Sequence, residues 1–154
     1  SALDAGVERF REIYELRWHE KTRPYPGVME MLDSLQNTPT SIAVLSNKPD
    51  TFTRQCVHYF FPSIHFHAAA GNITGVPLKP DPQSTIDMLR TLETQPNQCL
   101  FVGDSSVDIK TGRAAGTRTL GVTWGFRTET ELIEAGADAV ISTPEELLHY
   151  VIAS

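Results

Sequence analysis

The sequence lacks the features that mark membrane, disulfide-stabilised and nucleic-acid-binding proteins. Its 154 residues include only two cysteines, Cys56 and Cys99, which lie in apolar stretches rather than in a spaced pair. We therefore expect two reduced, buried thiols in a cytoplasmic protein. No apolar run approaches the length of a membrane span, and no signal-peptide pattern opens the sequence. Lys and Arg total 13 against 19 Asp and Glu, without a basic cluster, which argues against a nucleic-acid partner.

Low-complexity tracts are also absent, and the content of 40% apolar and 21% charged residues is that of an ordinary globular protein. The length suits one domain with a small appendage. The first residue is Ser rather than Met. We therefore expect the sequence to begin at a processed, engineered or truncated end.

Hydrophobic periodicity predicts helices first and then a regular alternation of strands and helices. Helical spacing covers residues 3–21, and a stretch with two prolines and Gly27 interrupts it before a second helix that starts at Val28. The predicted strands are Ile42–Leu45, Phe66–Ala70, Cys99–Val102, Thr119–Val122 and Ala139–Ile141. The predicted helices between and after them cover about 51–60, 81–92, 107–115, 128–136 and 143 onward.

This alternation predicts an α/β fold with a parallel sheet and helices on both faces. The continuously apolar strands indicate burial on both faces of the sheet. In such sheets, ligands bind beyond the carboxyl ends of the strands. The residues that follow each strand are therefore the candidates for chemistry.

Two of these candidates suit the binding of an anion. Ser46 and Asn47 follow the first strand, where a hydroxyl and backbone N–H groups can face a phosphate, although such a turn can also only cap the next helix. Lys79 lies between a loop and two prolines, and its ammonium could neutralise a phosphate or a carboxylate. Alone, Lys79 could equally be a solvated loop lysine.

A third candidate suits a metal ion. Gly103 and Asp104 follow the third predicted strand, and Asp108 lies four residues later, in the first turn of a helix, where it can face the same space. Two carboxylates make a hard, oxygen-rich site of the kind that Mg²⁺ prefers. The alternative is that Asp104 and Ser105 only cap the helix.

Taken in order, these segments resemble motifs of the haloacid dehalogenase superfamily. Leu45-Ser46-Asn47-Lys48 resembles its second motif, Lys79 its third, and Gly103-Asp104 with Asp108 its fourth. The segment Val122-Thr123-Trp124-Gly125-Phe126 and the residues after it are similar to the phosphoglycolate phosphatase branch. The resemblance implies that residues 1–23 are the last helix and hinge of a helical cap. It also implies that residues 24–154 are a Rossmann-like α/β core without its first strand.

The resemblance also implies a role for each candidate. Ser46 and Asn47 would bind the transferring phosphoryl group through hydroxyl and backbone N–H, and Lys79 would offset charge between that group and the nucleophile. Asp104 would ligate Mg²⁺, and Asp108 would ligate it or orient its ligands. Ser46 and Lys79 are thus the predicted catalytic residues.

The first motif of the superfamily, Asp-x-Asp at the end of the central strand, is missing from the sequence. Its first Asp is the nucleophile, and its second is the acid and base. In the family this strand lies between Ile42–Leu45 and Cys99–Val102, so its absence would leave a slot open to water. We therefore expect an N-terminal segment in the native protein. Without it, we expect no turnover and poor solubility as a monomer.

The function that the resemblance implies is Mg²⁺-dependent hydrolysis of a small phosphomonoester, such as phosphoglycolate, through an aspartyl-phosphate intermediate. The partner would be a small phosphorylated metabolite, with no nucleic acid and no membrane, and the protein would be a monomer or a homodimer. Phosphonate cleavage and sugar-phosphate mutation on the same fold stay open, because the deciding residues lie largely in the cap. A non-catalytic phosphate-binding module stays open if the chain is complete.

Overall fold

The computed structural model describes residues 23–152 of the chain. The predicted helix over residues 3–21, and with it the expected remnant of a cap, lies outside the described residues. The helices are α2 (Val28–Gln36), α3 (Asp50–Phe60), α4 (Gln83–Thr91), the short 3₁₀ helix η1 (Pro96–Gln98), α5 (Ser106–Ala114), α6 (Glu129–Glu134) and α7 (Glu146–Ile152). The strands are β1 (Ala43–Pro49), β2 (Ala68–Asn72), β3 (Leu100–Gly103), β4 (Arg118–Val122) and β5 (Ala139–Ile141).

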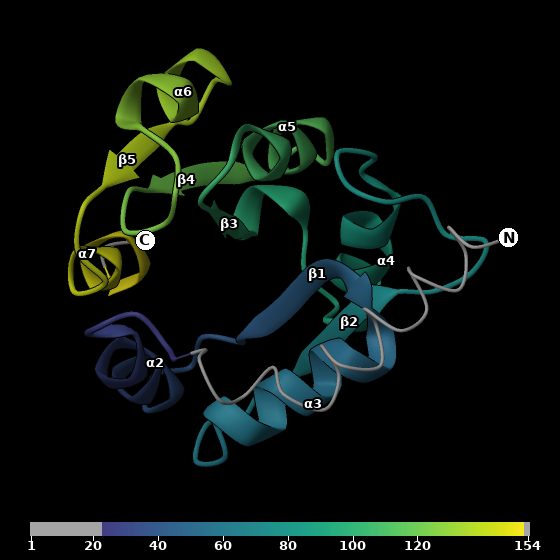
Figure 1. The fold of residues 1–154 in the computed structure, drawn as a ribbon, viewed down its shortest axis with the longest axis horizontal. Helices are drawn as coiled ribbons and strands as arrows, with labels where there is room; N and C mark the ends of the chain where they lie inside the picture. The colour runs from purple at the N-terminus through teal and green to yellow at the C-terminus, as the bar shows by residue number, and fades with distance from the viewer. Residues whose placement is uncertain (1–22, 153–154) are drawn as a thin grey trace, which may run out of the picture.

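Every strand pair is parallel, which confirms the predicted α/β class. β1 pairs with β2, and β4 lies between β3 and β5. The pairing forms two sheets, of two and three strands, rather than one continuous sheet. Figure 1 shows β1–β2 and β3–β5 on opposite sides of the molecule's centre. Among the described residues, no strand pairs with the inner edge of β1 or of β3.

Helices cover both faces of the three-stranded sheet, as the sequence predicts. On one face α5 packs so closely that a side chain at Gly112 would meet Thr119 Cγ2 at 2.7 Å and Phe101 Cβ at 2.9 Å. On the same face, a Cβ at Gly121 would lie 3.1 Å from the side chain of Leu132 in α6. The neighbouring positions of β4 therefore point to the other face, because side chains alternate along a strand.

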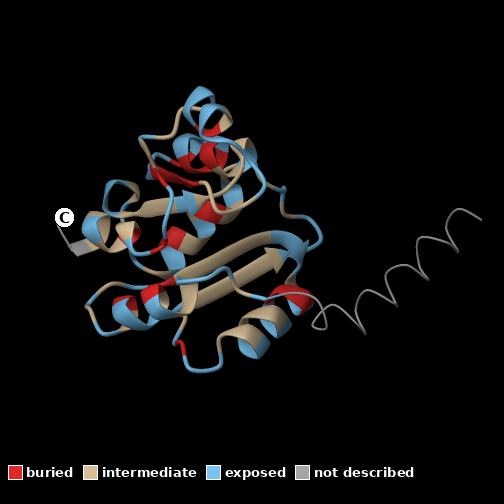
Figure 2. Cartoon of the chain, turned by 60° about the vertical axis from the view of Figure 1, so that its left-hand side comes forward, coloured by how far each residue is buried: buried red, intermediate tan, exposed pale blue. Residues whose placement is uncertain are grey.

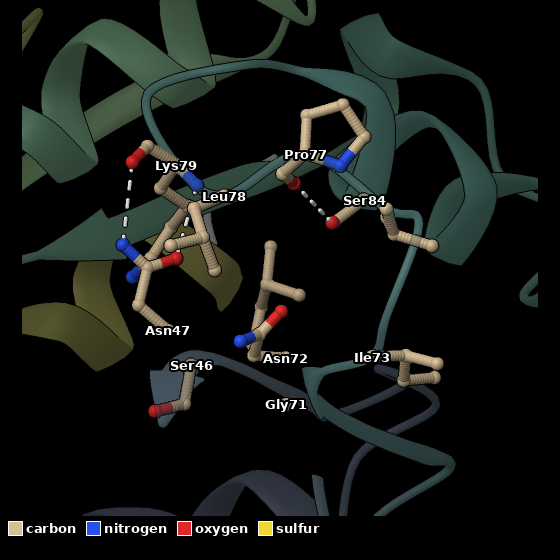
Figure 3. Close-up of a pocket in the computed structure, with 11 residues that line it drawn as sticks. Ser46, Asn47, Gly71, Asn72, Ile73, Pro77, Leu78, Lys79 and Ser84 are labelled. Atoms are coloured by element: carbon tan, nitrogen blue, oxygen red, sulfur yellow. Dashed lines mark hydrogen bonds between the residues drawn. The ribbon is translucent and has the colours of Figure 1, made fainter. Parts of the chain in front are cut away.

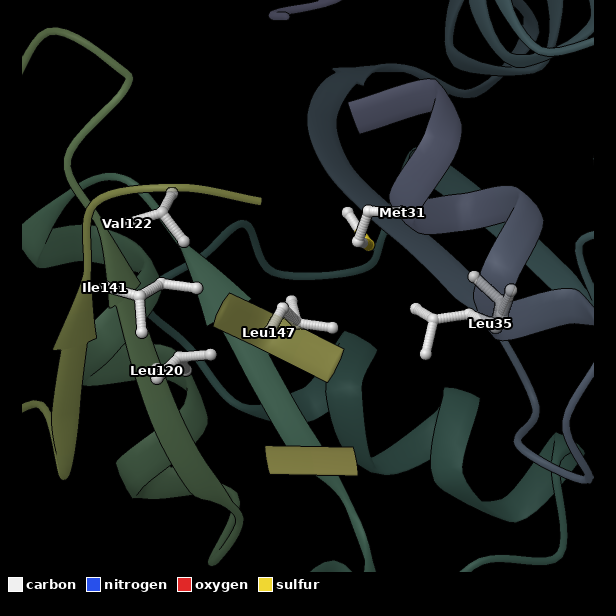
Figure 4. Packing of buried hydrophobic residues seen from close by; sticks show 7 residues of the cluster. Met31, Leu35, Leu120, Val122, Ile141 and Leu147 are labelled. Carbon is white, nitrogen blue, oxygen red and sulfur yellow. The ribbon is translucent and has the colours of Figure 1, made fainter. Parts of the chain in front are cut away.

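That other face carries the main hydrophobic core. Figure 4 shows side chains of α2 and α7 directed toward β4 and β5. Burial of this apolar surface holds α2, α7 and the three-stranded sheet together. The buried members of the cluster are Met31, Leu35, Ile42, Leu120, Val122, Ile141 and Leu147.

The inner strands, β1 and β3, and the neighbouring β2 are less buried than the sequence predicts. Figure 2 shows β4 with buried residues, whereas β1 and β2 carry none. Val102 in β3 is 38% exposed. Side chains from both inner strands line a cavity of about 630 Å³, together with α2, α4 and α7. The continuous apolar runs of β1 and β3 therefore lack a neighbour that would cover their inner edges within the part of the chain described.

The helix starts confirm one predicted cap and correct two others. Thr128 caps α6, because its hydroxyl accepts from the Glu131 N–H at 3.2 Å. The predicted cap at Thr143 is wrong: α7 begins at Glu146, whose carboxylate accepts from the Ser142 N–H at 3.1 Å. Asp81 is not the N-cap of α4, although its carboxylate accepts from the Gln83 N–H at 2.8 Å. In the last two cases a side-chain acceptor still satisfies a free N–H, but the helix begins one residue or more away from the predicted start.

None of the helices that the structure describes is long and apolar enough to cross a membrane.

Candidate active site

The candidate residues lie at the carboxyl ends of strands, where the fold predicts a ligand site. β1 pairs regularly with β2 up to Leu45 and then irregularly up to Pro49. Ser46 and Asn47 lie in this irregular part. The Ser46 hydroxyl accepts from the Lys48 N–H at 3.1 Å, which leaves its own proton to be donated to a ligand.

The side chain of Asn47 contacts the loop between β2 and α4 (Figure 3). Its Oδ1 accepts from the Lys79 N–H at 3.0 Å, and its Nδ2 donates to the Lys79 carbonyl at 3.2 Å. Both polar atoms of the amide therefore bind the main chain of one residue, 32 positions away. Figure 3 shows Asn47 and Lys79 joined by these hydrogen bonds at one side of a small pocket that Ser46 and Asn72 also line.

Lys79 reaches from this loop to the other sheet. Its Nζ lies 2.7 Å from Oδ1 of Asp108, and each side chain is 13% exposed. Asp108 is in the first turn of α5, directly after β3. Such a pair, largely withdrawn from water, is screened less by salt than a surface pair. Lys79 and Asp108 both line the large cavity between β1 and β3.

The second oxygen of Asp108 is also occupied. Asp108 Oδ2 accepts from the Asp104 N–H at 3.2 Å and from the Ser105 hydroxyl at 3.1 Å. Ser105 is the N-cap of α5, and its hydroxyl oxygen accepts from the Asp108 N–H. Gly103 leaves room for this carboxyl, because a Cβ there would lie 2.6 Å from Asp108 Cγ.

The surroundings of Asp104 disfavour the charged form of its carboxyl. Burial, and then the neighbouring Asp108 carboxylate, raise the pKa of Asp104 above its usual value. The loop after β4 closes one side: an added Cβ at Gly125 would lie 2.9 Å from Asp104 Cγ. The negative charge of a carboxylate held this way would be stabilised by a nearby cation.

These two aspartates are the described residues that could hold a metal ion. No group of three or more His, Cys, Asp or Glu gathers at a possible metal site in residues 23–152. Mg²⁺ commonly takes only one or two protein carboxylates and completes its shell with water and phosphate oxygens. The donor set of Asp104 and Asp108 therefore fits Mg²⁺, with a need for further oxygen ligands.

The structure joins four of the five sequence candidates by direct contacts. Asn47 contacts Lys79, Lys79 contacts Asp108, and Asp108 contacts the main chain of Asp104. Ser46 lines the same small pocket as Asn47 and Lys79.

Sequence reasoning missed two neighbours, Ser105 and Gly125. Ser105 was considered as a helix cap, which the structure confirms, but the hydrogen bond from its hydroxyl to Asp108 was not predicted. For Gly125 no local pattern exists, because its contact is with a residue 21 positions away.

Other polar candidates keep structural roles. His67 Nδ1 accepts from the Ile42 N–H at 3.0 Å and so extends the pairing at the start of β1. Cys56 and Cys99 are free thiols, each partly buried, and burial raises the pKa of both.

Comparison with known proteins agrees with this geometry. A family model described as haloacid dehalogenase-like hydrolase matches residues 2–122. The chain belongs to this family. A phosphoglycolate phosphatase of Aquifex aeolicus is 31% identical over 92% of the chain and 65% of its own length. Phosphoglycolate phosphatase 1 of Pseudomonas aeruginosa is 30% identical over 94% of the chain and 53% of its own length.

Solved structures show the same fold. A crystal structure from Lactobacillus delbrueckii subsp. bulgaricus, described as a candidate phosphoglycolate phosphatase, superimposes with a TM-score of 0.88 at 32% identity. The match covers 94% of this chain and 60% of that one. This haloacid dehalogenase-like chain thus spans only about half to two thirds of the length of these relatives.

Proposed function

We propose that the protein containing this chain is a Mg²⁺-dependent phosphatase that hydrolyses a small phosphomonoester similar to phosphoglycolate. The observation that carries the proposal is the placement of Lys79. Its ammonium lies 2.7 Å from Asp108, and its main chain is bound to the side chain of Asn47. This arrangement holds a positive charge between the ends of β1 and β3. The names of the phosphoglycolate phosphatase relatives add support for the substrate class.

Each described side chain has a task in this proposal. The Ser46 hydroxyl donates to a phosphoryl oxygen, and the ammonium of Lys79 offsets negative charge between the phosphoryl group and the attacking group. Asp108 orients the ammonium. Because both Asp108 oxygens already accept hydrogen bonds, we assign it to positioning and assign direct metal ligation to Asp104.

Charge balance explains why the site would need the metal. The Lys79 ammonium contacts the Asp108 carboxylate, and the carboxylate of Asp104 lies near both charges, so one positive charge faces two negative charges. A phosphomonoester dianion would therefore meet net negative charge. When bound, Mg²⁺ would offset the charge on the phosphoryl oxygens as it develops.

The nucleophile is proposed to come from a strand outside the described residues. The inner edges of β1 and β3 are unpaired among those residues, and a cavity of about 630 Å³ with a largely apolar set of side chains separates them. A parallel strand here would pair with both edges and join the two sheets into one. At its carboxyl end, an aspartate would lie near Lys79. That carboxylate would attack phosphorus to form an aspartyl phosphate, and the leaving alkoxide would take a proton from the second Asp of the Asp-x-Asp motif. Water, deprotonated by the same Asp, would then hydrolyse the aspartyl phosphate and release phosphate.

The test is phosphate release by the full-length protein from a panel of phosphomonoesters that includes phosphoglycolate and p-nitrophenyl phosphate. We expect release with Mg²⁺ and none after chelation by EDTA. Asp104→Asn should lower kcat about 100-fold or more, because it removes the charge that holds the metal. Asp33→Asn, an exposed site on α2 that hydrogen bonds Gln36, is the matched control and should keep full activity.

Absence of phosphate release across the whole panel would contradict the proposal. Binding of phosphate and Mg²⁺ without turnover by the full-length protein would instead identify a non-catalytic binding module. Interconversion of sugar phosphates without net phosphate release would identify a mutase.

A further inference from the structure

Asn47 is the site residue whose side chain has a contact that the proposed chemistry does not require. The family resemblance implies that Ser46 and Asn47 bind the phosphoryl group through hydroxyl and backbone N–H, which leaves the Asn47 side chain without a role. In the structure, both functional atoms of its amide bind the main chain of Lys79. We propose that the side chain of Asn47 is a positioning residue that sets the location of the Lys79 ammonium. This proposal rests on the phosphatase function proposed above.

The geometry of the contact explains why the residue is asparagine. One Asn side chain offers an acceptor oxygen and donor N–H groups on the same short stem. Here the oxygen accepts from the Lys79 N–H at 3.0 Å while the nitrogen donates to the Lys79 carbonyl at 3.2 Å. An aspartate at this position would keep the acceptor but turn a second oxygen toward the carbonyl. Two bonds to a single residue fix both its distance and its orientation.

The other main-chain hydrogen bonds described for the loop that carries Lys79 lie within the loop or join it to α4. Leu78 is 46% exposed, and a Cβ at Gly75 would meet no atom within 4 Å. The two residues before Lys79 accept hydrogen bonds: the Leu78 carbonyl from the Asp81 N–H at 3.0 Å, and the Pro77 carbonyl from the Ser84 hydroxyl at 3.3 Å. The Asn47 contact is thus the one among these that ties the loop to the end of β1.

Lys79 is consequently held at both ends. Its main chain is bound to Asn47 on the two-stranded sheet, and its ammonium to Asp108 beside the three-stranded sheet. The row Asn47–Lys79–Asp108 spans from one sheet to the other beside the large cavity. A shift of the Lys79 main chain would move the ammonium away from the phosphoryl group, and displacements of about 1 Å at such sites can cost about 100-fold in rate.

The first test is kinetic, with Asn47→Ala, Asn47→Asp, Lys79→Ala and the double variant Asn47→Ala/Lys79→Ala in the full-length protein. We expect Asn47→Ala and Asn47→Asp each to lower kcat about 10–100-fold, with KM changed by less than about 3-fold. The double variant should be no slower than Lys79→Ala, because Asn47 acts through Lys79. Asn37→Ala is the matched control: Asn37 also donates to a main-chain carbonyl, of Asp33 at 2.9 Å, and its loss should leave kcat unchanged.

Two kinetic results would overturn the proposal. One is a fall in the kcat of the double variant that equals the product of the falls in the two single variants. The other is a raised KM at unchanged kcat in Asn47→Ala. Either result would mean that the Asn47 side chain binds the phosphate itself.

The second test does not depend on turnover, so it separates this proposal from the phosphatase function. An amine-acylating reagent is applied to wild type and Asn47→Ala, and modification is located by peptide mass spectrometry. The Lys79 side chain is 13% exposed, whereas Lys110 is exposed and serves as the internal reference. We expect Lys79 to be labelled several-fold faster in Asn47→Ala than in wild type, relative to Lys110. An unchanged ratio would show that Asn47 does not hold Lys79 in place.

Discussion

Gly103→Ala tests whether the space beside β3 is reserved for the Asp108 carboxyl. A methyl group at position 103 would overlap the Asp108 side chain, with Cγ at 2.6 Å and Oδ2 at 2.7 Å. Real Cβ atoms do not approach other atoms this closely. The carboxyl must therefore move, and it cannot move without disturbing the contacts that both of its oxygens make.

The size of the effect follows from those contacts. Asp108 accepts from Lys79 Nζ at 2.7 Å, from the Asp104 N–H at 3.2 Å and from the Ser105 hydroxyl at 3.1 Å. Overpacking costs about 1–3 kcal/mol, and loss of a hydrogen bond to a charged group about 1.5–3 kcal/mol. Because the two effects overlap, we expect a loss of about 2–4 kcal/mol in the free energy of unfolding. That loss corresponds to a fall in Tm of about 4–16 °C for a protein of this size class.

The assay is urea denaturation of wild type and two glycine variants of the full-length protein. Gly75→Ala is the control, because a Cβ there meets no atom within 4 Å and the positive φ of 90° is its only penalty, about 1–2 kcal/mol. Gly103→Ala should lose more stability than this control and should also lose phosphatase activity, which Gly75→Ala should keep. A Gly103→Ala variant as stable as wild type would refute the placement of the Asp108 carboxyl against Gly103.

Two further predictions concern the acid response and the inner strand edges. The Thr119 N–H donates to Asp138 at 2.7 Å and holds the pKa of that carboxyl below 3.8, so the stability it contributes is present above pH 3.8 and lost as pH falls through the lowered value. Asp138→Asn should cost about 1 kcal/mol near neutral pH and flatten the decline of stability below pH 4 in urea denaturation; parallel pH curves for variant and wild type would contradict this. In hydrogen exchange, amides of Ala43–Leu45 and Leu100–Val102 should be more protected in the full-length protein than in the 154-residue chain, because the proposed strand would pair with them there. The amides of β4, paired on both sides, should be protected in both forms, and equal protection of the inner strands would argue against the added strand.

Local sequence pattern was enough to predict most of the elements. Short apolar runs separated by helical periodicity gave all five strands to within a few residues, because burial in a covered parallel sheet selects such runs. The positions of Ser46, Lys79 and Asp104 were predictable for a related reason. Ser46 lies in the carboxyl-terminal part of β1, Asp104 comes directly after β3, and Lys79 lies in the loop that follows β2. Helix starts were less predictable, since Asp81 and Glu146 each accept with a carboxylate from a nearby free N–H, that of Gln83 and that of Ser142.

The sequence by itself thus determined the α/β class, the order of strands and the identity of the polar residues at their ends. These properties depend on short-range periodicity, which the chain carries at every point. Only the tertiary structure decided that the strands form two sheets with a cavity between β1 and β3. It also decided that Asn47 binds the main chain of Lys79 and that both carboxylate oxygens of Asp108 accept hydrogen bonds from neighbouring residues. Such contacts join residues up to 32 positions apart, so they depend on how the elements pack and not on any local pattern.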